Sequence, residues 1–204
     1  ALTALITLIA PTANADNSGN YDWTGASLTN DNFSDATNWA SNTWDQWSDY
    51  RFGGTPTRTS ATINDFFGIA SITLQSGLTT DIVINTSFTT QDNPVIMSTG
   101  QAGGTAASIT IAVDSKNLTI NGRYIVGASP VTWNVGSGRA LTLNGALENW
   151  YGTASLVKNG DGTAVLNGAS SYTGGTTING GTLNVQGGAI SNQARTNSIA
   201  SGAG

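Results

Sequence analysis

Hydrophobic and small polar residues alternate in short runs along most of this chain of 204 residues, and a glycine closes many of the runs. Alternation with a period of two predicts β-strands that each bury one face. A clear example is Leu141-Thr142-Leu143, which precedes Gly145. Strand-turn units of this kind end at regularly spaced glycines: Gly77, Gly100, Gly122, Gly145 and Gly168. The pattern therefore predicts an all-β chain with an internal repeat.

A near-constant step of about 23 residues between these glycines predicts a β-solenoid, because each unit holds two or more strands and cannot bury its own apolar face. Coils stacked at ~4.8 Å would close the core along the axis. One aliphatic residue from each coil would then form an internal ladder, for which we expect Leu74, Met97, Ile120, Leu143 and Leu166. An antiparallel sandwich also suits strands of this length. We favour the solenoid because a sandwich has no reason to keep a constant step.

The segment 21–52 differs from the rest, since it holds half of the sixteen aromatic residues and lacks the glycine step. A solenoid end exposes strand edges and an open core, and large aromatic side chains close a core with few residues. We therefore predict an aromatic-rich N-terminal cap over residues 16–60 and the β-solenoid over residues 61–204.

The same aromatic segment has a second interpretation as a sugar-binding face. Tryptophan rings would stack on pyranose rings while carboxylates accept hydrogen bonds from the hydroxyl groups. The glycan-binding candidates are Trp39, Trp44, Trp47, Asp45 and Asp49.

Composition narrows the function further. Only 9% of the residues are charged, the net charge is −5, and no cluster of lysine or arginine supplies a footprint for nucleic acid. The chain has no cysteine and no histidine, which excludes disulfides, thiolate or imidazole metal ligands and a Ser-His-Asp triad. Such a turn-rich, weakly charged composition is typical of extracellular β proteins.

Carboxylates are the main groups left for catalysis. Asp31 and Asp35 are close in sequence, as are Asp45 and Asp49, but spacing in loops establishes neither a fixed separation nor a raised pKa. A calcium turn at residues 159–163 would have one aspartate, whereas Ca²⁺ takes about six to eight oxygen ligands. We predict no enzymatic activity, no cofactor and no metal site.

The first fifteen residues form an apolar run followed by a proline and Ala13-Asn14-Ala15. This pattern resembles the apolar region and small-residue cleavage site of a secretory signal, and the run is too short to span a membrane. If the run is retained instead, we expect it to pair as a donated strand with an open sheet edge, such as that of a neighbouring subunit.

Residues 156–185 resemble the autotransporter-associated β-strand repeat of passenger regions in secreted bacterial surface proteins. The resemblance covers about thirty of the 204 residues. Its matching positions are Leu156, Lys158, Gly160, Gly162, Thr163, Leu166, Gly168, Tyr172, Gly174, Gly175, Thr176, Gly181, Thr182 and Leu183. The departures are mild: Ala164 replaces a large aliphatic residue, Ser170 an asparagine, and Gly180 an alanine.

This resemblance implies a right-handed parallel β-helix that is exported to the cell surface or released, and it implies no catalytic residue. We therefore expect a non-enzymatic structural or adhesive module of passenger type. Its expected partners are an outer-membrane translocator and, for adhesion, surface glycans or copies of the chain itself. The alternative is a subunit of an extracellular filament, assembled by end-to-end or donated-strand contacts. A glycan-binding or polysaccharide-degrading β-helix is a third interpretation.

Overall fold

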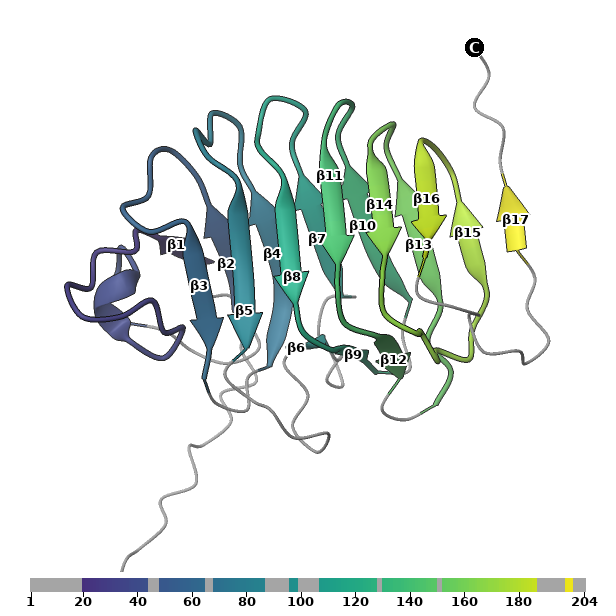
Figure 1. Cartoon of the computed structure of the whole chain (residues 1–204), viewed down its shortest axis with the longest axis horizontal. Helices are drawn as coiled ribbons and strands as arrows, with labels where there is room; N and C mark the ends of the chain where they lie inside the picture. Colours follow the sequence, from purple (N-terminus) through teal and green to yellow (C-terminus); the bar gives the residue numbers. More distant parts are fainter. Residues whose placement is uncertain are drawn as a thin grey trace, which may run out of the picture.

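The computed structural model describes residues 20–43, 48–64, 68–86, 96–98, 107–127, 130–149, 152–186 and 197–199. These residues form a parallel β-solenoid whose coils follow one another along a single axis (Figure 1). The strands of one sheet run downward at the front while those of a second sheet run upward behind, and the chain advances from left to right. The coil is therefore right-handed, as the resemblance implied.

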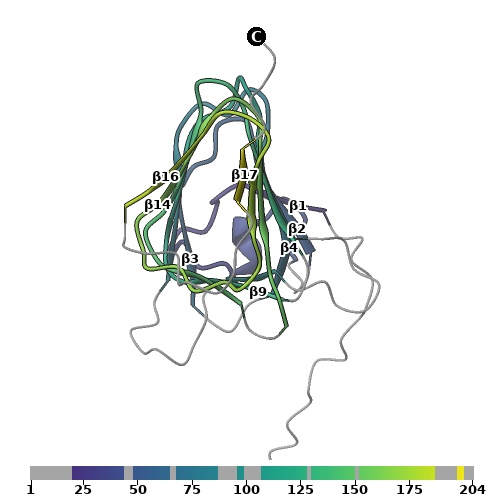
Figure 2. The same cartoon turned by 90° about the vertical axis from the view of Figure 1, so that its right-hand side faces the viewer.

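Three sheets form the walls of the solenoid, and every strand pair in them is parallel. Sheet A contains β1 (Asn20–Trp23), β2 (Ser48–Phe52), β4 (Ile69–Leu74), β7 (Ser108–Ile111), β10 (Val131–Val135), β13 (Leu156–Asn159), β15 (Thr176–Ile178) and β17 (Asn197–Ile199). Sheet B contains β3 (Ser60–Ile63), β5 (Ile82–Thr86), β8 (Leu118–Asn121), β11 (Ala140–Leu143), β14 (Thr163–Leu166) and β16 (Thr182–Val185). Sheet C contains β6 (Ile96–Ser98), β9 (Tyr124–Val126) and β12 (Leu147–Asn149). Figure 2 shows sheets A and B facing each other across the core.

Alternation along each strand places one set of side chains inside this core, as the sequence pattern predicted. In sheet B, Ile84 pairs with Ile120, Ile120 with Leu143, and Leu143 with Leu166. All four side chains are fully buried. Each buried aliphatic side chain contributes about 1.5–3 kcal/mol relative to exposure, so this ladder is a major source of stability.

Two members of the predicted ladder lie in other sheets. Leu74 belongs to sheet A, where it pairs with Phe52 and Ile111. Met97 belongs to sheet C, where it pairs with Ile125. The prediction was wrong here because strands of all three walls alternate in the same way, so the pattern does not reveal which wall a strand joins.

The coils of the solenoid are not all equally long. In sheet B the register advances by 23 residues from Ile120 to Leu143 and again from Leu143 to Leu166. The hydrogen-bonded asparagines that follow these strands are separated by the same 23 residues. From Ile84 to Ile120 the step is 36 residues, because the connection that includes β6 lengthens this coil. The next pairing, of Leu166 with Val185, closes a coil shorter than either. Extra length is therefore accommodated between the walls while the register within a wall is kept.

The N-terminal end of the solenoid is covered by its own chain. Asn32 bridges Thr62 in parallel, the Phe33 amide donates to the Thr62 carbonyl at 2.8 Å, and the Thr62 amide donates to the Asp31 carbonyl at 2.7 Å. These contacts cover the free edge of β3. On the other wall Trp23 in β1 bridges Trp39, which follows the short 3₁₀ helix η1 (Ala36–Asn38). β1 and β2 lie within the range predicted as the cap and are also strands of sheet A; the predicted domain boundaries stay predictions.

Close stacking of successive coils explains the recurring glycines. A Cβ atom added to Gly145 would lie 1.9 Å from the carbonyl oxygen of Gly122 in the preceding coil. We expect Gly145→Ala to lower the free energy of unfolding by about 1–3 kcal/mol, since backbone atoms must shift to relieve the overlap. Urea denaturation of the two chains measures this loss.

Gly180→Ala is the matched control for this substitution. The nearest atom to a Cβ at position 180 is the Gly160 carbonyl oxygen, at 3.3 Å, so the added atom needs only a small adjustment of its neighbour. We expect its stability to stay within about 0.5 kcal/mol of the wild type. Equal effects of the two substitutions would contradict the stacking explanation.

Candidate functional site

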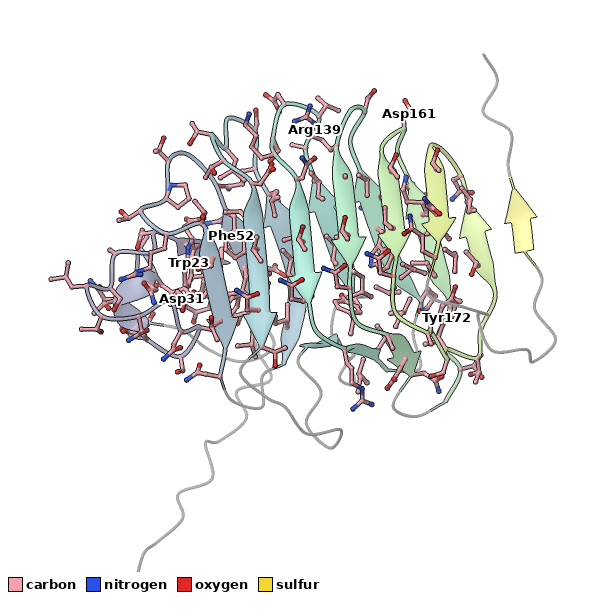
Figure 3. The ribbon with its side chains drawn as sticks, viewed as in Figure 1. Trp23, Asp31, Phe52, Arg139, Asp161 and Tyr172 are labelled. Carbon is pink, nitrogen blue, oxygen red and sulfur yellow. The ribbon has the colours of Figure 1, made fainter. Side chains whose placement is uncertain are left out.

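The aromatic residues near the N-terminus form one buried cluster. Trp23, Phe33, Trp39, Tyr50 and Phe52 are each at most 3% exposed. The rings of Trp23 and Trp39 meet edge to face with centroids 4.9 Å apart, and Phe33 and Trp39 do so at 5.1 Å. Edge-to-face and offset contacts of this kind add to the stability that burial already supplies. Figure 3 shows Trp23 and Phe52 inside this end of the molecule.

Both buried indole groups in this cluster are hydrogen-bonded. Trp23 Nε1 donates to the Arg58 carbonyl at 3.0 Å, and Trp39 Nε1 donates to the Phe33 carbonyl at 2.8 Å. The cluster thus closes the core without leaving these donors unpaired, which would be costly.

The structure describes two of the five predicted glycan-binding residues. Trp39 is 1% exposed and packs within the aromatic cluster. Asp49 lies in β2, where a carboxylate oxygen accepts a hydrogen bond from Ser71 Oγ at 2.5 Å. Trp44, Asp45 and Trp47 lie outside the described residues. Glycan binding by this segment stays a prediction.

Asp31 and Asp35 are the other carboxylate pair identified in the sequence. Both accept hydrogen bonds that hold the N-terminal end together. Asp31 accepts from Ser60 Oγ at 2.5 Å and from Thr62 Oγ1 at 3.1 Å, which ties the covering segment to β3. Asp35 is the N-cap of η1 and accepts from the Thr37 amide and the Thr37 hydroxyl. Sequence spacing identified the pair but not these separate roles.

Asp35 is a carboxyl group with a strongly lowered pKa. The hydroxyl of Thr37 and then that of Ser27 stabilise the carboxylate by hydrogen bonding and lower the pKa of Asp35 to about 2. Asn30 also donates to it, at 2.9 Å. A carboxyl group held ionised in this way accepts hydrogen bonds and has no proton to donate near neutral pH.

We expect acid to remove the stabilisation that Asp35 provides. Because its pKa is lower in the folded than in the unfolded chain, the contribution is complete above about pH 4 and is lost as the pH falls towards 2. Thermal melts of wild type and Asp35→Asn should therefore differ at pH 5 and converge towards pH 2. A difference in melting temperature that is the same at both pH values would contradict this role.

Outside the N-terminal end, charged side chains lie mainly on turns and edges. Arg139 and Asp161 are on turns that join sheet A to sheet B (Figure 3). Arg123 pairs with Glu148 of sheet C. At the N-terminal end, Arg51 of β2 makes a two-point contact with Asp22 of β1, at 2.7 and 2.8 Å. Among the described residues, no three histidine, cysteine, aspartate or glutamate side chains come together in a way that could hold a metal ion.

The outward-facing residues of sheets A and B are small and uncharged from β4 to β14. In sheet A they are Ser71, Thr73, Ser108, Thr110, Thr132, Asn134, Val157 and Asn159. Sheet B is similar in β5, β8, β11 and β14. These flat walls offer repeated hydroxyl and amide groups rather than a localised reactive centre.

Lys158 is the unusual group in the repeat segment, since its side chain points into the core and is fully buried. Its Nζ donates to the carbonyls of Asn159 at 2.8 Å, Gly160 at 2.7 Å and Gly180 at 3.2 Å. Burial lowers the pKa of Lys158, and the negative charge of Asp161 partly offsets that effect. The ammonium group thus donates its three hydrogen bonds to three backbone carbonyls. Two of them lie in the turn after β13 and the third lies in the turn of the next coil, so the ammonium group links the two turns.

Tyr172 occupies the corner of the same repeat. It is fully buried, and its hydroxyl shares a 2.5 Å hydrogen bond with Thr176 Oγ1. The two large polar side chains of the repeat motif, Lys158 and Tyr172, are thus both buried. The carbonyl cluster around the ammonium group could not be predicted from the sequence.

Two ladders of asparagine side chains follow the ends of the strands. Beside sheet B, Asn121 donates to Asn85 at 2.9 Å, Asn144 to Asn121 at 2.6 Å, and Asn167 to Asn144 at 2.6 Å. Sheet A carries the second ladder, in which Asn159 donates to Asn134 at 2.9 Å and Asn179 to Asn159 at 2.8 Å. Sequence reasoning missed both ladders, although Asn121, Asn144 and Asn167 share the step of the glycines and would have indicated the first.

Comparison with known protein families matches residues 156–185 to the passenger-associated-transport-repeat. This is the range that carried the sequence resemblance, which is thereby confirmed. Neither a curated protein nor a solved structure matches the chain. Within the part of the chain that the structure describes, no helix has the length and apolar character needed to cross a bilayer. The segment 156–185 is therefore a passenger-associated-transport-repeat, built into β13–β16 of a parallel β-solenoid.

Proposed function

We propose that the chain is a non-enzymatic extracellular module, structural or adhesive, of a secreted or cell-surface protein of the autotransporter passenger type. The observation that carries the proposal is the repeat at residues 156–185. Its Leu156, Lys158, Leu166 and Tyr172 are all fully buried. The repeat thus supplies core and turns of the solenoid, which is an architectural role.

The chemistry of the described carboxylates supports a role without catalysis. Asp31 and Asp35 accept hydrogen bonds that hold the N-terminal end, Asp22 pairs with Arg51, and Glu148 pairs with Arg123. A hydrolase of the paired-carboxylate type needs one carboxyl group with a raised pKa, whereas that of Asp35 is lowered.

Labelling of intact cells tests the surface location. The chain has no cysteine, so an introduced thiol is a specific probe of this module. Thr142 and Leu143 are neighbours in β11, where Thr142 faces outward and Leu143 is fully buried. In cells that produce the whole protein, Thr142→Cys should react with a maleimide that does not cross membranes, while the matched control Leu143→Cys should not.

Each outcome of the labelling experiment is informative. Reaction of Thr142→Cys on intact cells supports export of the folded solenoid. Reaction only after cell lysis would refute the surface location. The adhesive part of the proposal requires a second comparison: cells with the chain should bind glycan-coated surfaces, or one another, more strongly than cells that lack it.

A filament subunit is the second candidate, and the exposed edge at β16 favours it. Thr182, Asn184 and Val185 are exposed there, and Val185 is 37% exposed. The covered N-terminal end weighs against end-to-end stacking, because residues 31–33 already occupy the edge of β3. Strand donation by residues 1–15 concerns residues outside those described. Filaments in electron micrographs, with an intact mass that retains residues 1–15, would favour this candidate over the first.

A further inference from the structure

Every Asn-Gly dipeptide of the sequence lies in one of the two asparagine ladders. The five asparagines are Asn121, Asn144, Asn159, Asn167 and Asn179. The remaining ladder asparagines precede β-branched residues, in Asn85-Thr86 and Asn134-Val135. The ladders therefore gather all the Asn-Gly steps of the molecule into two hydrogen-bonded rows.

Packing makes two of the glycines in these dipeptides, Gly145 and Gly168, hard to replace, whereas Gly180 has more room for a Cβ atom. A Cβ atom on Gly145 would lie 1.9 Å from the Gly122 carbonyl oxygen, and one on Gly168 would lie 2.3 Å from the Gly145 carbonyl carbon. At these two positions the asparagine is needed for the ladder and the glycine for the close approach of the coils. The combination also creates a chemical liability, because glycine has no side chain to hinder its own amide nitrogen.

That liability is deamidation. The backbone nitrogen of the glycine attacks Cγ of the preceding asparagine; the new C–N bond closes a succinimide ring, the Cγ–Nδ2 bond breaks, and ammonia leaves. Water then opens the ring to aspartate or isoaspartate. The sum is one water consumed and one ammonia released, with no oxidant or cofactor. To react, the side-chain amide must first turn away from its ladder partners.

We propose that the ladders set the order in which these sites deamidate, with Asn167 and Asn179 reacting first. Asn121, Asn144 and Asn159 are internal rungs, each of which donates one ladder hydrogen bond and accepts another. Asn167 donates to Asn144, but its Oδ1 has no hydrogen-bond partner among the described residues. Asn179 donates to Asn159. No described residue donates a hydrogen bond to the side-chain oxygen of Asn179, so Asn179 is the last rung of its ladder among the described residues.

Deamidation of a terminal asparagine should then accelerate deamidation of the next asparagine in the same ladder, in the direction of the N-terminus. An aspartate at position 167 has acceptors only, so it cannot donate to Asn144 Oδ1 as the amide did. Asn144 is left with a single ladder bond and becomes the next terminal rung. The conversion also places negative charge on a wall whose outward-facing residues are otherwise uncharged.

The test is to incubate the purified full-length chain in mildly alkaline buffer and follow each Asn-Gly peptide by mass spectrometry, since deamidation adds about 1 Da. One additional ladder bond should slow an internal rung about fivefold, which corresponds to about 1 kcal/mol. The chain unfolded in urea is the control, in which the five dipeptides should react at similar rates. Asn85 and Asn134 should remain unchanged because β-branched residues follow them.

Two variants distinguish an effect that passes along one ladder from a general loss of structure that would accelerate deamidation in both ladders. Asn167→Asp should accelerate Asn144 about fivefold and leave Asn159, in the other ladder, unchanged. Asn179→Asp should accelerate Asn159 and leave Asn144 unchanged. Equal rates at terminal and internal rungs of the folded wild type would overturn the proposal, as would acceleration in both ladders by either variant. The wild-type measurement alone is decisive if a variant fails to fold, and none of these outcomes depends on where the protein is located.

Discussion

Leu143→Asp is expected to prevent folding of the solenoid. Leu143 is fully buried in sheet B, between Ile120 of one coil and Leu166 of the next. Removing a buried leucine costs about 2–5 kcal/mol, and burying an unpaired carboxylate costs several more. Because a typical domain is stable by only about 5–15 kcal/mol, the sum can remove all of it. Circular dichroism during thermal melting should show no cooperative transition, or one at a much lower temperature.

Thr142→Asp is the matched control, since it introduces the same carboxylate on the adjacent, outward-facing position. We expect it to change the free energy of unfolding by no more than about 1 kcal/mol, the range of strand propensities. A Leu143→Asp chain that melted at the wild-type temperature would show that Leu143 does not face the core and that the register of β11 is wrong.

The second large effect is expected from Lys158→Met, which keeps most of the apolar stem but removes the ammonium group. The carbonyls of Asn159, Gly160 and Gly180 would lose their shared donor. Since hydrogen bonds to a charged group contribute about 1.5–3 kcal/mol each, and turns near the surface can partly rehydrate, we expect a loss of about 2–4 kcal/mol. Chemical denaturation measures this loss directly.

Lys116→Met is a suitable comparison, because Lys116 lies in the turn between β7 and β8 and is not enclosed by the core. Its replacement should change stability by no more than about 0.5 kcal/mol. If both variants lose the same stability, removal of a positive charge from the chain, and not the carbonyl cluster at Lys158, would explain the effect.

The sequence predicted the fold class because the glycine step and the alternation of residues both follow from stacking similar coils. It predicted the positions of Ile120, Leu143 and Leu166 in one ladder, since these three have no insertion between them. Leu74 and Met97 were placed in the wrong wall because the coil between Ile84 and Ile120 is longer than the others. A period counted along the chain assumes equal coils, and three-dimensional pairing does not require them.

The candidate site was harder to predict, because side-chain roles depend on partners from other coils. Asp31 and Asp35 are neighbours in sequence but bind different groups: Asp35 binds Thr37 within the same turn, and Asp31 binds Ser60 in β3. Lys158 was recognised by its place in the repeat, whereas its three carbonyl partners include Gly180 from the following coil. Contacts of this kind leave no pattern in the local sequence.

The unequal coils also determine how the molecule should respond to force. In a solenoid each coil contacts only its neighbours, so a chain pulled from its ends can lose one coil at a time. An extended chain spans about 3.3–3.6 Å per residue while a stacked coil occupies about 4.8 Å, so a coil of about 23 residues should release about 75 Å. The longer coil between Ile84 and Ile120 should release about 120 Å, and the shorter one between Leu166 and Val185 about 60 Å. Single-molecule extension traces would therefore identify each coil by the length of its step.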